Sequence, residues 1–288
     1  MPSWMQKTRV TLEMIKWEHS IFALPFALTG AVLAARGWPT LRITTIIILC
    51  MVSARTSAMA FNRWADAELD AANPRTQSRA IPARLLDRSF VAAFVVISAA
   101  VFILGCALLN RLCLLLSPVC LAVLLGYSYA KRFTRWSHLV LGLALGIAPT
   151  AAWIAVRGSL DARILLLTLA VLLWVAGFDV LYACQDFDHD RAAGLNSIPQ
   201  SFGIPAAFAI ARMLHVLMLI TLLVLIHAFV LGPTSLAGVA VTAALLLYEH
   251  SIISPTDLRR MNAAFFTLNG VISVVFLLFI ASDVLLHR

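Results

Sequence analysis

Two short windows of the sequence concentrate the side chains that could do chemistry. Only 12% of the 288 residues are charged, yet half of the 14 acidic residues fall within residues 62–70 and 179–190. In so apolar a chain, clustered carboxylates are unfavourable unless something neutralises them. The seven residues are Asp66, Glu68, Asp70, Asp179, Asp186, Asp188 and Asp190.

Both windows place oxygen-bearing side chains at helical spacing. They are Asn62, Asp66 and Asp70 in the first window, and Asp179, Tyr182, Asp186 and Asp190 in the second. Carboxylates stacked on one helical face repel one another unless a cation lies between them. Oxygen ligands suit a hard cation, and Mg²⁺ typically takes one or two carboxylates plus phosphate oxygens of a substrate. The windows therefore predict Mg²⁺ and a phosphorylated substrate.

Basic side chains near the windows could hold the phosphate oxygens that Mg²⁺ leaves uncovered. The candidates are Arg63, Arg75, Arg79, Lys131 and Arg132. The competing explanation is that Lys and Arg accumulate on the cytoplasmic side of any membrane protein. Arg55 is different, because it lies inside a predicted helix one to two turns before Asn62. A charge inside a membrane helix indicates a site residue.

Membrane helices are predicted to position these residues. The mean hydropathy is +0.92, and about nine apolar runs are long enough to cross a hydrocarbon core of about 30 Å. The runs lie near 17–35, 41–61, 90–109, 112–129, 137–156, 164–183, 206–230, 234–250 and 263–285. They lack the period-2 alternation of barrel strands, and no linker interrupts the chain. We expect an all-α, polytopic bundle that forms a single membrane domain over residues 1–288.

The distribution of basic residues predicts the orientation of the bundle. Most Lys and Arg fall in alternate connections, which places the N-terminus and both acidic windows in the cytoplasm and the C-terminus outside. The net charge of +8 thus reflects membrane topology, and we expect no nucleic-acid partner and no obligate protein partner. The N-terminus carries no organelle-targeting extension, which favours a bacterial inner membrane.

Three segments carry a family resemblance. NRWADAELDAANPRTQSRAIP (62–82) resembles the NxxxDxxxD segment of the UbiA superfamily of intramembrane aromatic prenyltransferases, and DVLYACQDFDHDRAAGLNSIPQSFG (179–203) resembles its second Asp-rich segment. GYSYAKRFTRWSHLVLG (126–142) is similar to the stretch with Tyr then Lys-Arg after the fourth helix. The motifs stand in the order of the family, and the expected topology extends the likeness over nearly the whole chain.

The resemblance implies transfer of a polyprenyl group from polyprenyl diphosphate to a hydroxyaromatic carboxylic acid, with Mg²⁺ as cofactor. It implies that Asn62, Asp66 and Asp70 hold one Mg²⁺, and Asp186 and Asp190 the other. Arg63, Lys131 and Arg132 would contact the diphosphate, and Asp66, Asp70, Asp186 and Asp190 form the expected catalytic set. We expect Asp179, Tyr182 and Arg55 to bind the acceptor. The apolar bundle would keep an allylic cation from water.

The acceptor is the open question within this class. The opening KWEHSIFALPFALTG (16–30) resembles members that act on 4-hydroxybenzoate in ubiquinone synthesis, and we expect that acceptor. It also resembles relatives that prenylate 1,4-dihydroxy-6-naphthoate in menaquinone synthesis, which is the alternative. Gly194-Leu195-Asn196-Ser197 lacks a Lys common in the family, and His189 replaces a common Asp.

A membrane transporter is the alternative from another class, because acids inside membranes often mark ion pathways. The acids of this chain cluster at predicted helix ends, however, and leave the middle of the bundle nearly without them. Gly142 and Gly146, near Pro149, could break a helix, but they equally suit close helix packing. We therefore favour the enzyme.

Overall fold

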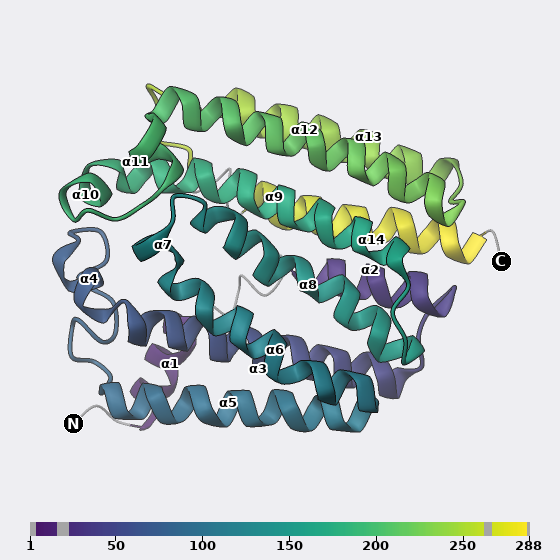
Figure 1. Ribbon diagram of the computed structural model, residues 1–288, viewed down its shortest axis with the longest axis horizontal. Helices are drawn as coiled ribbons and strands as arrows, with labels where there is room; N and C mark the ends of the chain where they lie inside the picture. The colour runs from purple at the N-terminus through teal and green to yellow at the C-terminus, as the bar shows by residue number, and fades with distance from the viewer. Residues whose placement is uncertain (1–3, 16–22, 262–266, 287–288) are drawn as a thin grey trace.

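Membrane-length helices dominate the computed structural model, which describes residues 4–15, 23–261 and 267–286. The described residues form helices and loops, without a strand beyond one isolated bridge between Ser254 and Asp257. Figure 1 shows the long helices side by side along one direction. In chain order they are α1 (Trp4–Ile15), α2 (Leu24–Ala35), α3 (Leu41–Ala65), α4 (Ala67–Ala72), α5 (Arg88–Leu109), α6 (Arg111–Gly126), α7 (Ala130–Phe133), α8 (Ser137–Arg157), α9 (Leu165–Ala183), α10 (Phe187–Ala192), α11 (Ile198–Phe202), α12 (Ile204–Phe229), α13 (Pro233–Ile252) and α14 (Asn269–Leu286).

Eight helical segments of the described chain are long and apolar enough to cross a membrane. They confirm eight of the nine expected spans, from the run near 41–61 onward. The run near 17–35 appears as α2, which has 12 residues, and the opening segment 16–22 lies outside the described residues. At 1.5 Å per residue the described helix α2 spans about 18 Å, so a ninth full crossing stays a prediction.

Close backbone contacts hold the centre of the bundle together. A methyl group on Gly142 of α8 would lie 2.4 Å from the Leu172 carbonyl oxygen of α9. A methyl group on Gly146 would lie 2.8 Å from the Thr168 carbonyl oxygen of the same helix. Gly30 of α2 approaches the Pro149 carbonyl of α8 equally closely. These small residues let the helices pack tightly, which confirms the packing explanation for Gly142 and Gly146.

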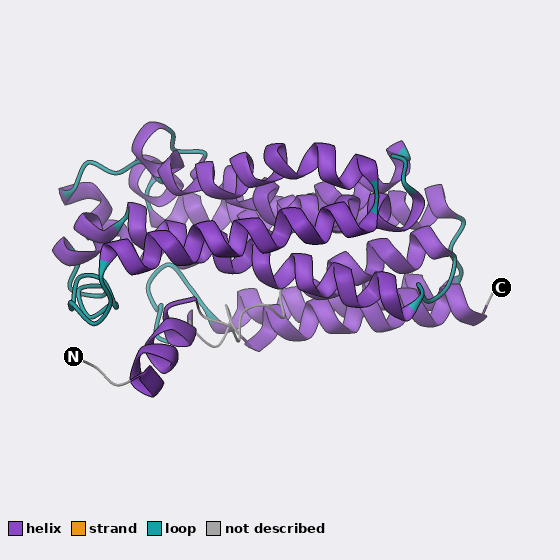
Figure 2. Cartoon of the chain, turned by 90° about the horizontal axis from the view of Figure 1, so that it is seen from below, coloured by secondary structure: helices purple, strands orange, loops and turns teal. Residues whose placement is uncertain are grey.

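The short helices gather at one end of the bundle. In Figure 1, α4, α7, α10 and α11 lie together at the left, and the view in Figure 2 shows loops and short helices at the same end. The two acidic windows, which are separated by more than 100 positions in the sequence, therefore lie at the same end of the molecule.

A helix break at an aspartate lies in each window. Asp66 separates α3 from α4 with φ −95° and ψ 8°, and Asp186 precedes α10 with φ −102° and ψ 9°. Both dihedral pairs lie in the bridge region, which often holds active-site residues. The backbone therefore turns at Asp66 and at Asp186, a feature that the helical spacing does not indicate. The amide of Asp66 still donates to the Asn62 carbonyl at 2.9 Å, so the chain bends with little loss of helical hydrogen bonding.

Candidate active site

A polar pocket of about 230 Å³ joins the two acidic windows. Its walls come from α3, α4, the turns after α4, the segment 127–131, the start of α8, the end of α9, α10 and the loop that leads to α11. The expected site residues that line it are Asn62, Arg63, Asp66, Asp70, Lys131, Asp179, Tyr182, Asp186 and Asp190. Arg75 and Arg79, expected only as candidate cations, also line the pocket.

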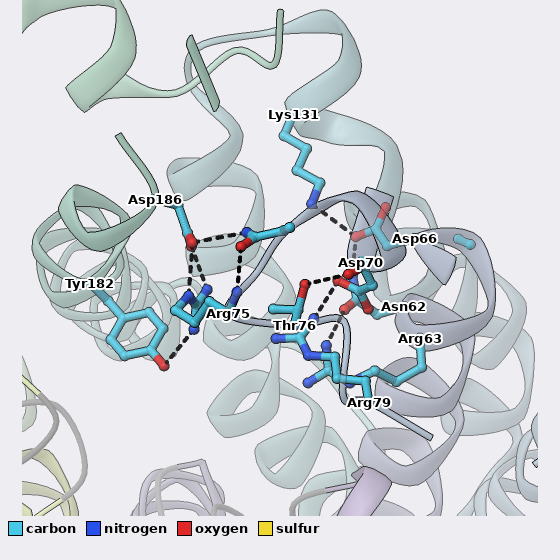
Figure 3. Close-up of polar contacts among 12 residues, drawn as sticks. Asn62, Arg63, Asp66, Asp70, Arg75, Thr76, Arg79, Lys131, Tyr182 and Asp186 are labelled. Carbon is cyan, nitrogen blue, oxygen red and sulfur yellow. Dashed lines mark hydrogen bonds and ion pairs between the residues drawn. The ribbon is translucent and has the colours of Figure 1, made fainter. Parts of the chain in front are cut away.

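Asp66 is buried, and it contacts two cations from a distant part of the chain. Lys131 Nζ lies 3.1 Å from Asp66 Oδ2, and Arg132 Nη2 lies 3.1 Å from Oδ1. Arg132 also donates to the backbone carbonyl of Ala65 at 2.7 Å, which anchors it at the helix break. Asn62 Nδ2 donates to Asp66 Oδ2 at 3.3 Å. Figure 3 shows Lys131 and Asn62 converging on this carboxylate.

Asp70 has a nearer partner in sequence. Arg79 Nη1 lies 2.6 Å from Asp70 Oδ1, and Thr76 Oγ1 donates to the Asp70 backbone carbonyl at 3.0 Å. The turns after α4 therefore fold back onto that helix (Figure 3). The second oxygen, Asp70 Oδ2, is buried and accepts no hydrogen bond in the described part of the chain. A carboxylate oxygen in that state can still bind a cation or a donor.

Arg75 connects the first window to the second. It donates to Asp186 through Nε at 2.8 Å and through Nη2, and its Nη1 donates to the Tyr182 hydroxyl at 3.3 Å. Asn73 Nδ2 donates to Asp186 Oδ1 at 3.2 Å. Burial acts to lower the pKa of Arg75, but Asp186 and Tyr182 outweigh it and the net pKa is raised. The guanidinium therefore stays charged, and it holds the windows together.

An apolar cavity of about 540 Å³ opens beside the polar pocket. Both spaces are lined by Asn62, Arg63, Asp179 and Tyr182, so a molecule could reach from one into the other. Arg55 lines the apolar cavity and not the polar pocket, and its Nε atom is buried without a hydrogen-bond partner among the described residues. The walls also include four cysteines, which are Cys50, Cys106, Cys113 and Cys120.

The donor set of the polar pocket fits a hard cation. In the described ranges, no three His, Cys, Asp or Glu side chains converge on one point where a metal ion could bind. Mg²⁺ is typically held by one or two carboxylates together with water and phosphate oxygens. Asp70 Oδ2 offers an uncommitted acceptor. Lys131, Arg132, Arg75 and Arg79 now pair with the carboxylates and could turn to phosphate oxygens instead.

Sequence reasoning missed two residues that organise the site. Asn73 bonds Asp186 across 113 positions, and His138 lies 2.6 Å from Asp179 across 41 positions. Neither residue lies in an acidic window. Asn73 was close enough to Asp70 to be suspected, whereas His138 carried no signal.

The fold and the site define a polytopic helical membrane protein with a polar pocket beside an apolar cavity. The sequence profile of the UbiA prenyltransferase family matches residues 23–271. The chain therefore belongs to the UbiA prenyltransferase family, and it is an enzyme of that class.

Named relatives agree with this membership. A 4-hydroxybenzoate octaprenyltransferase of Vibrio cholerae is 30% identical over 68% of this chain and 70% of its own. A protein of the same name from Alkalilimnicola ehrlichii is 31% identical over 87% of this chain and 85% of its own.

Solved structures share the fold. A UbiA homologue from Aeropyrum pernix has a TM-score of 0.84 and 34% identity, covering 92% of this chain and 98% of its own. A UbiA homologue from Archaeoglobus fulgidus, solved with DMAPP and Mg²⁺, has a TM-score of 0.71 and 16% identity over 95% of this chain and 98% of its own. At that lower identity the likeness shows the fold alone.

Proposed function

We propose that this enzyme transfers a polyprenyl group from polyprenyl diphosphate to the ring carbon ortho to the hydroxyl of 4-hydroxybenzoate. The observation that carries the proposal is the junction of a charged pocket with an apolar cavity at Asn62, Arg63, Asp179 and Tyr182. A diphosphate suits the pocket, and an apolar tail suits the cavity. The names of the Vibrio cholerae and Alkalilimnicola ehrlichii relatives support this acceptor.

The diphosphate would be held at the two acidic windows. Asn62, Asp66 and Asp70 would hold one Mg²⁺, and Asp186 and Asp190 would hold a second. The Archaeoglobus fulgidus homologue, which was solved with DMAPP and Mg²⁺, supports this cofactor. Bound Mg²⁺ supplies neutralisation of the charge that develops on the leaving diphosphate. Arg63, Lys131 and Arg132 would bind the phosphate oxygens as charged donors.

The chain's own residues would then direct the reaction. The bond between the allylic carbon and the diphosphate oxygen breaks, and a bond forms between that carbon and the ring carbon. The walls of the apolar cavity exclude water from the allylic cation. Asp179, at the junction, accepts the proton of the acceptor hydroxyl, which makes the ortho carbon more electron-rich. The ring carbon then loses its proton to the departing diphosphate, and Asp179 returns its proton to the acceptor oxygen, so that prenylated acid and protonated diphosphate are released.

Arg55 is suited to the carboxylate of the acceptor. Its guanidinium lies in the same cavity as Asp179 and has a buried Nε atom without a hydrogen-bond partner in the described residues. A carboxylate ligand would supply that partner, because Arg binds carboxylates through two parallel hydrogen bonds. Tyr182 would contact the ring from the same side.

The proposal includes the setting of the enzyme. The helices form one membrane domain in a bacterial inner membrane, with the charged pocket facing the cytoplasm, the N-terminus inside and the C-terminus outside. The excess of Lys and Arg in the connections at the pocket end supports this orientation.

Prenyl transfer by the purified protein in detergent tests the proposal. The reaction would contain Mg²⁺, a polyprenyl diphosphate and either 4-hydroxybenzoate or 1,4-dihydroxy-6-naphthoate. Asp66→Ala and Asp186→Ala serve as controls. Product from 4-hydroxybenzoate that is lost in both variants supports the proposal. Product from the naphthoate alone moves the enzyme to menaquinone synthesis, and no Mg²⁺-dependent product from either acceptor refutes the mechanism.

A further inference from the structure

His138 occupies a buried position between three elements of the site. It lies in the first turn of α8 and is 4% exposed. Its Nδ1 atom is 2.6 Å from Asp179 Oδ2 of α9, and its Nε2 atom is 3.3 Å from the backbone nitrogen of Ile198 at the start of α11. Both ring nitrogens are therefore engaged.

The partners of the imidazole determine where its proton lies. A backbone N–H can only donate, so Nε2 must accept the hydrogen bond from Ile198 and carries no proton. The single ring proton of the neutral imidazole is then on Nδ1, from which it is donated to the carboxylate of Asp179. The histidine thus presents a fixed donor to Asp179 and cannot flip without breaking both contacts.

We propose that His138 is a positioning residue that aims the Asp179 carboxylate at the acceptor hydroxyl. This inference rests on the proposed function, in which Asp179 accepts the acceptor's proton. His138 engages Oδ2, whereas Oδ1 accepts no hydrogen bond that the described residues supply. Asp179 lines both the polar pocket and the apolar cavity, so Oδ1 is the oxygen available to the acceptor.

The other contact of His138 connects Asp179 to the second acidic window. Ile198 follows the loop that comes after Asp190, and the amide of Asn196 in that loop donates to the Lys131 carbonyl at 2.8 Å. Ser197 Oγ accepts from the Gln200 amide at 3.2 Å and caps α11. The imidazole therefore bonds both to the residue that would bind the acceptor and to the start of α11, next to the loop whose Asn196 amide holds the backbone of Lys131.

A merely structural role is the competing explanation, because His138 also joins three helices. Two amide substitutions separate the roles. The side-chain nitrogen of Asn can reach the place of Nδ1, so His138→Asn keeps a donor for Asp179 and loses the acceptor for Ile198. The end of a Gln side chain reaches the place of Nε2, so His138→Gln keeps the acceptor for Ile198 and loses the donor for Asp179.

The test measures acceptor-dependent kcat, KM for both substrates and thermal unfolding of the two full-length variants in detergent with Mg²⁺. Positioning by His138 predicts that kcat of His138→Gln falls about 10- to 100-fold, the range found when the hydrogen-bond partner that orients a metal ligand is lost. KM for the diphosphate stays near its wild-type value, and His138→Asn retains much more of the kcat. Equal losses in both variants that follow their unfolding temperatures, or an unchanged kcat in His138→Gln, would overturn the inference.

A second measurement is independent of turnover. The ¹⁵N spectrum of histidine-labelled protein, with the His138 signals assigned by their loss in His138→Gln, should show a protonated Nδ1 and an unprotonated Nε2. The reverse tautomer would overturn the inference. If wild-type enzyme prenylates neither acceptor while the tautomer is as expected, the proposed function fails and the geometry of the Asp179–His138 pair stands.

Discussion

Replacing Asp70 by Asn separates the contribution of this carboxylate to stability from its contribution to catalysis. The Asp70 side chain is 7% exposed and bonds Arg79 at 2.6 Å. In the Asp70→Asn variant, the amide oxygen of the introduced side chain can still accept from Arg79, so a charge-assisted hydrogen bond becomes a neutral one, a loss of about 1–1.5 kcal/mol. The wild-type carboxylate already has a buried oxygen without a partner among the described residues. Removing that charge offsets part of the loss, and we expect the stability to fall by about 1 kcal/mol.

The effect on activity should be larger. Removing one group that stabilises developing charge typically raises the barrier by about 2.7–4 kcal/mol, which is a loss of about 10²–10³ in rate. The measurement is kcat/KM for Mg²⁺-dependent prenyl transfer beside thermal unfolding in the same detergent. Mg²⁺ and a prenyl diphosphate should also stabilise wild-type protein against unfolding more than the variant.

Glu68→Gln is the matched control for this substitution. Glu68 lies two residues away in the same acidic window, but its side chain is 89% exposed, and its ion pair within the described part of the chain is with Arg88 at 3.3 Å. Exposed pairs of this kind contribute about 0–1 kcal/mol. We expect wild-type kcat/KM for Glu68→Gln. Near-normal kcat/KM for Asp70→Asn, or an equal loss in both variants, would refute the reasoning.

The packing of the helices and the lining of the cavities lead to three more predictions. Gly142→Ala should destabilise the protein by about 1–3 kcal/mol in thermal unfolding, because the introduced Cβ would lie 2.4 Å from a carbonyl oxygen of α9. Gly126→Ala is the control. Gly126 has no neighbour within 4 Å of the position of a Cβ, so this variant should keep the wild-type stability or gain about 0.4–1 kcal/mol. A lipid-soluble maleimide should label Cys113, which lies in the wall of the apolar cavity, and a polyprenyl diphosphate should slow that labelling. Buried Cys184, which lies outside the cavity wall, should show no such protection. Equal labelling rates of Cys113 with and without the diphosphate would place the prenyl tail elsewhere. Arg75→Lys should raise KM for the diphosphate, because Lys lacks the planar fork that bonds both Asp186 oxygens while it reaches Tyr182. An unchanged KM would show that this contact is dispensable.

Local pattern was sufficient to predict the helices and the content of the two windows. Apolar length predicted eight spans that the structure confirms, because in a bilayer the backbone must satisfy its own hydrogen bonds and a helix does so locally. The windows were expected on one side of the membrane, and the structure places both at one end of the bundle. Which side of the membrane this end faces stays a prediction.

The internal geometry of the site was beyond the sequence. The helix break at Asp66 is not indicated by the four-residue spacing of Asn62, Asp66 and Asp70. Arg75 hydrogen-bonds Asp186, which lies 111 positions later in the sequence, and His138 hydrogen-bonds Asp179, which lies 41 positions later. Contacts of that range follow from how the helices pack, and a single sequence without an alignment of relatives carries no signal for them.

The bond between Arg75 and Asp186 also has a consequence for biogenesis. As the chain is synthesised, Asp70 can pair with Arg79 within nine residues, and Asp66 can pair with Lys131 and Arg132 once α7 is complete. Asp186 is synthesised more than 100 residues after Arg75. In a chain arrested between α8 and α9, the carboxylates of Asp66 and Asp70 would therefore already be paired with cations. The guanidinium of Arg75 would still lack its partner Asp186. Insertion of α9 brings Asp186 to Arg75, so the two windows can be joined only after that helix is in place.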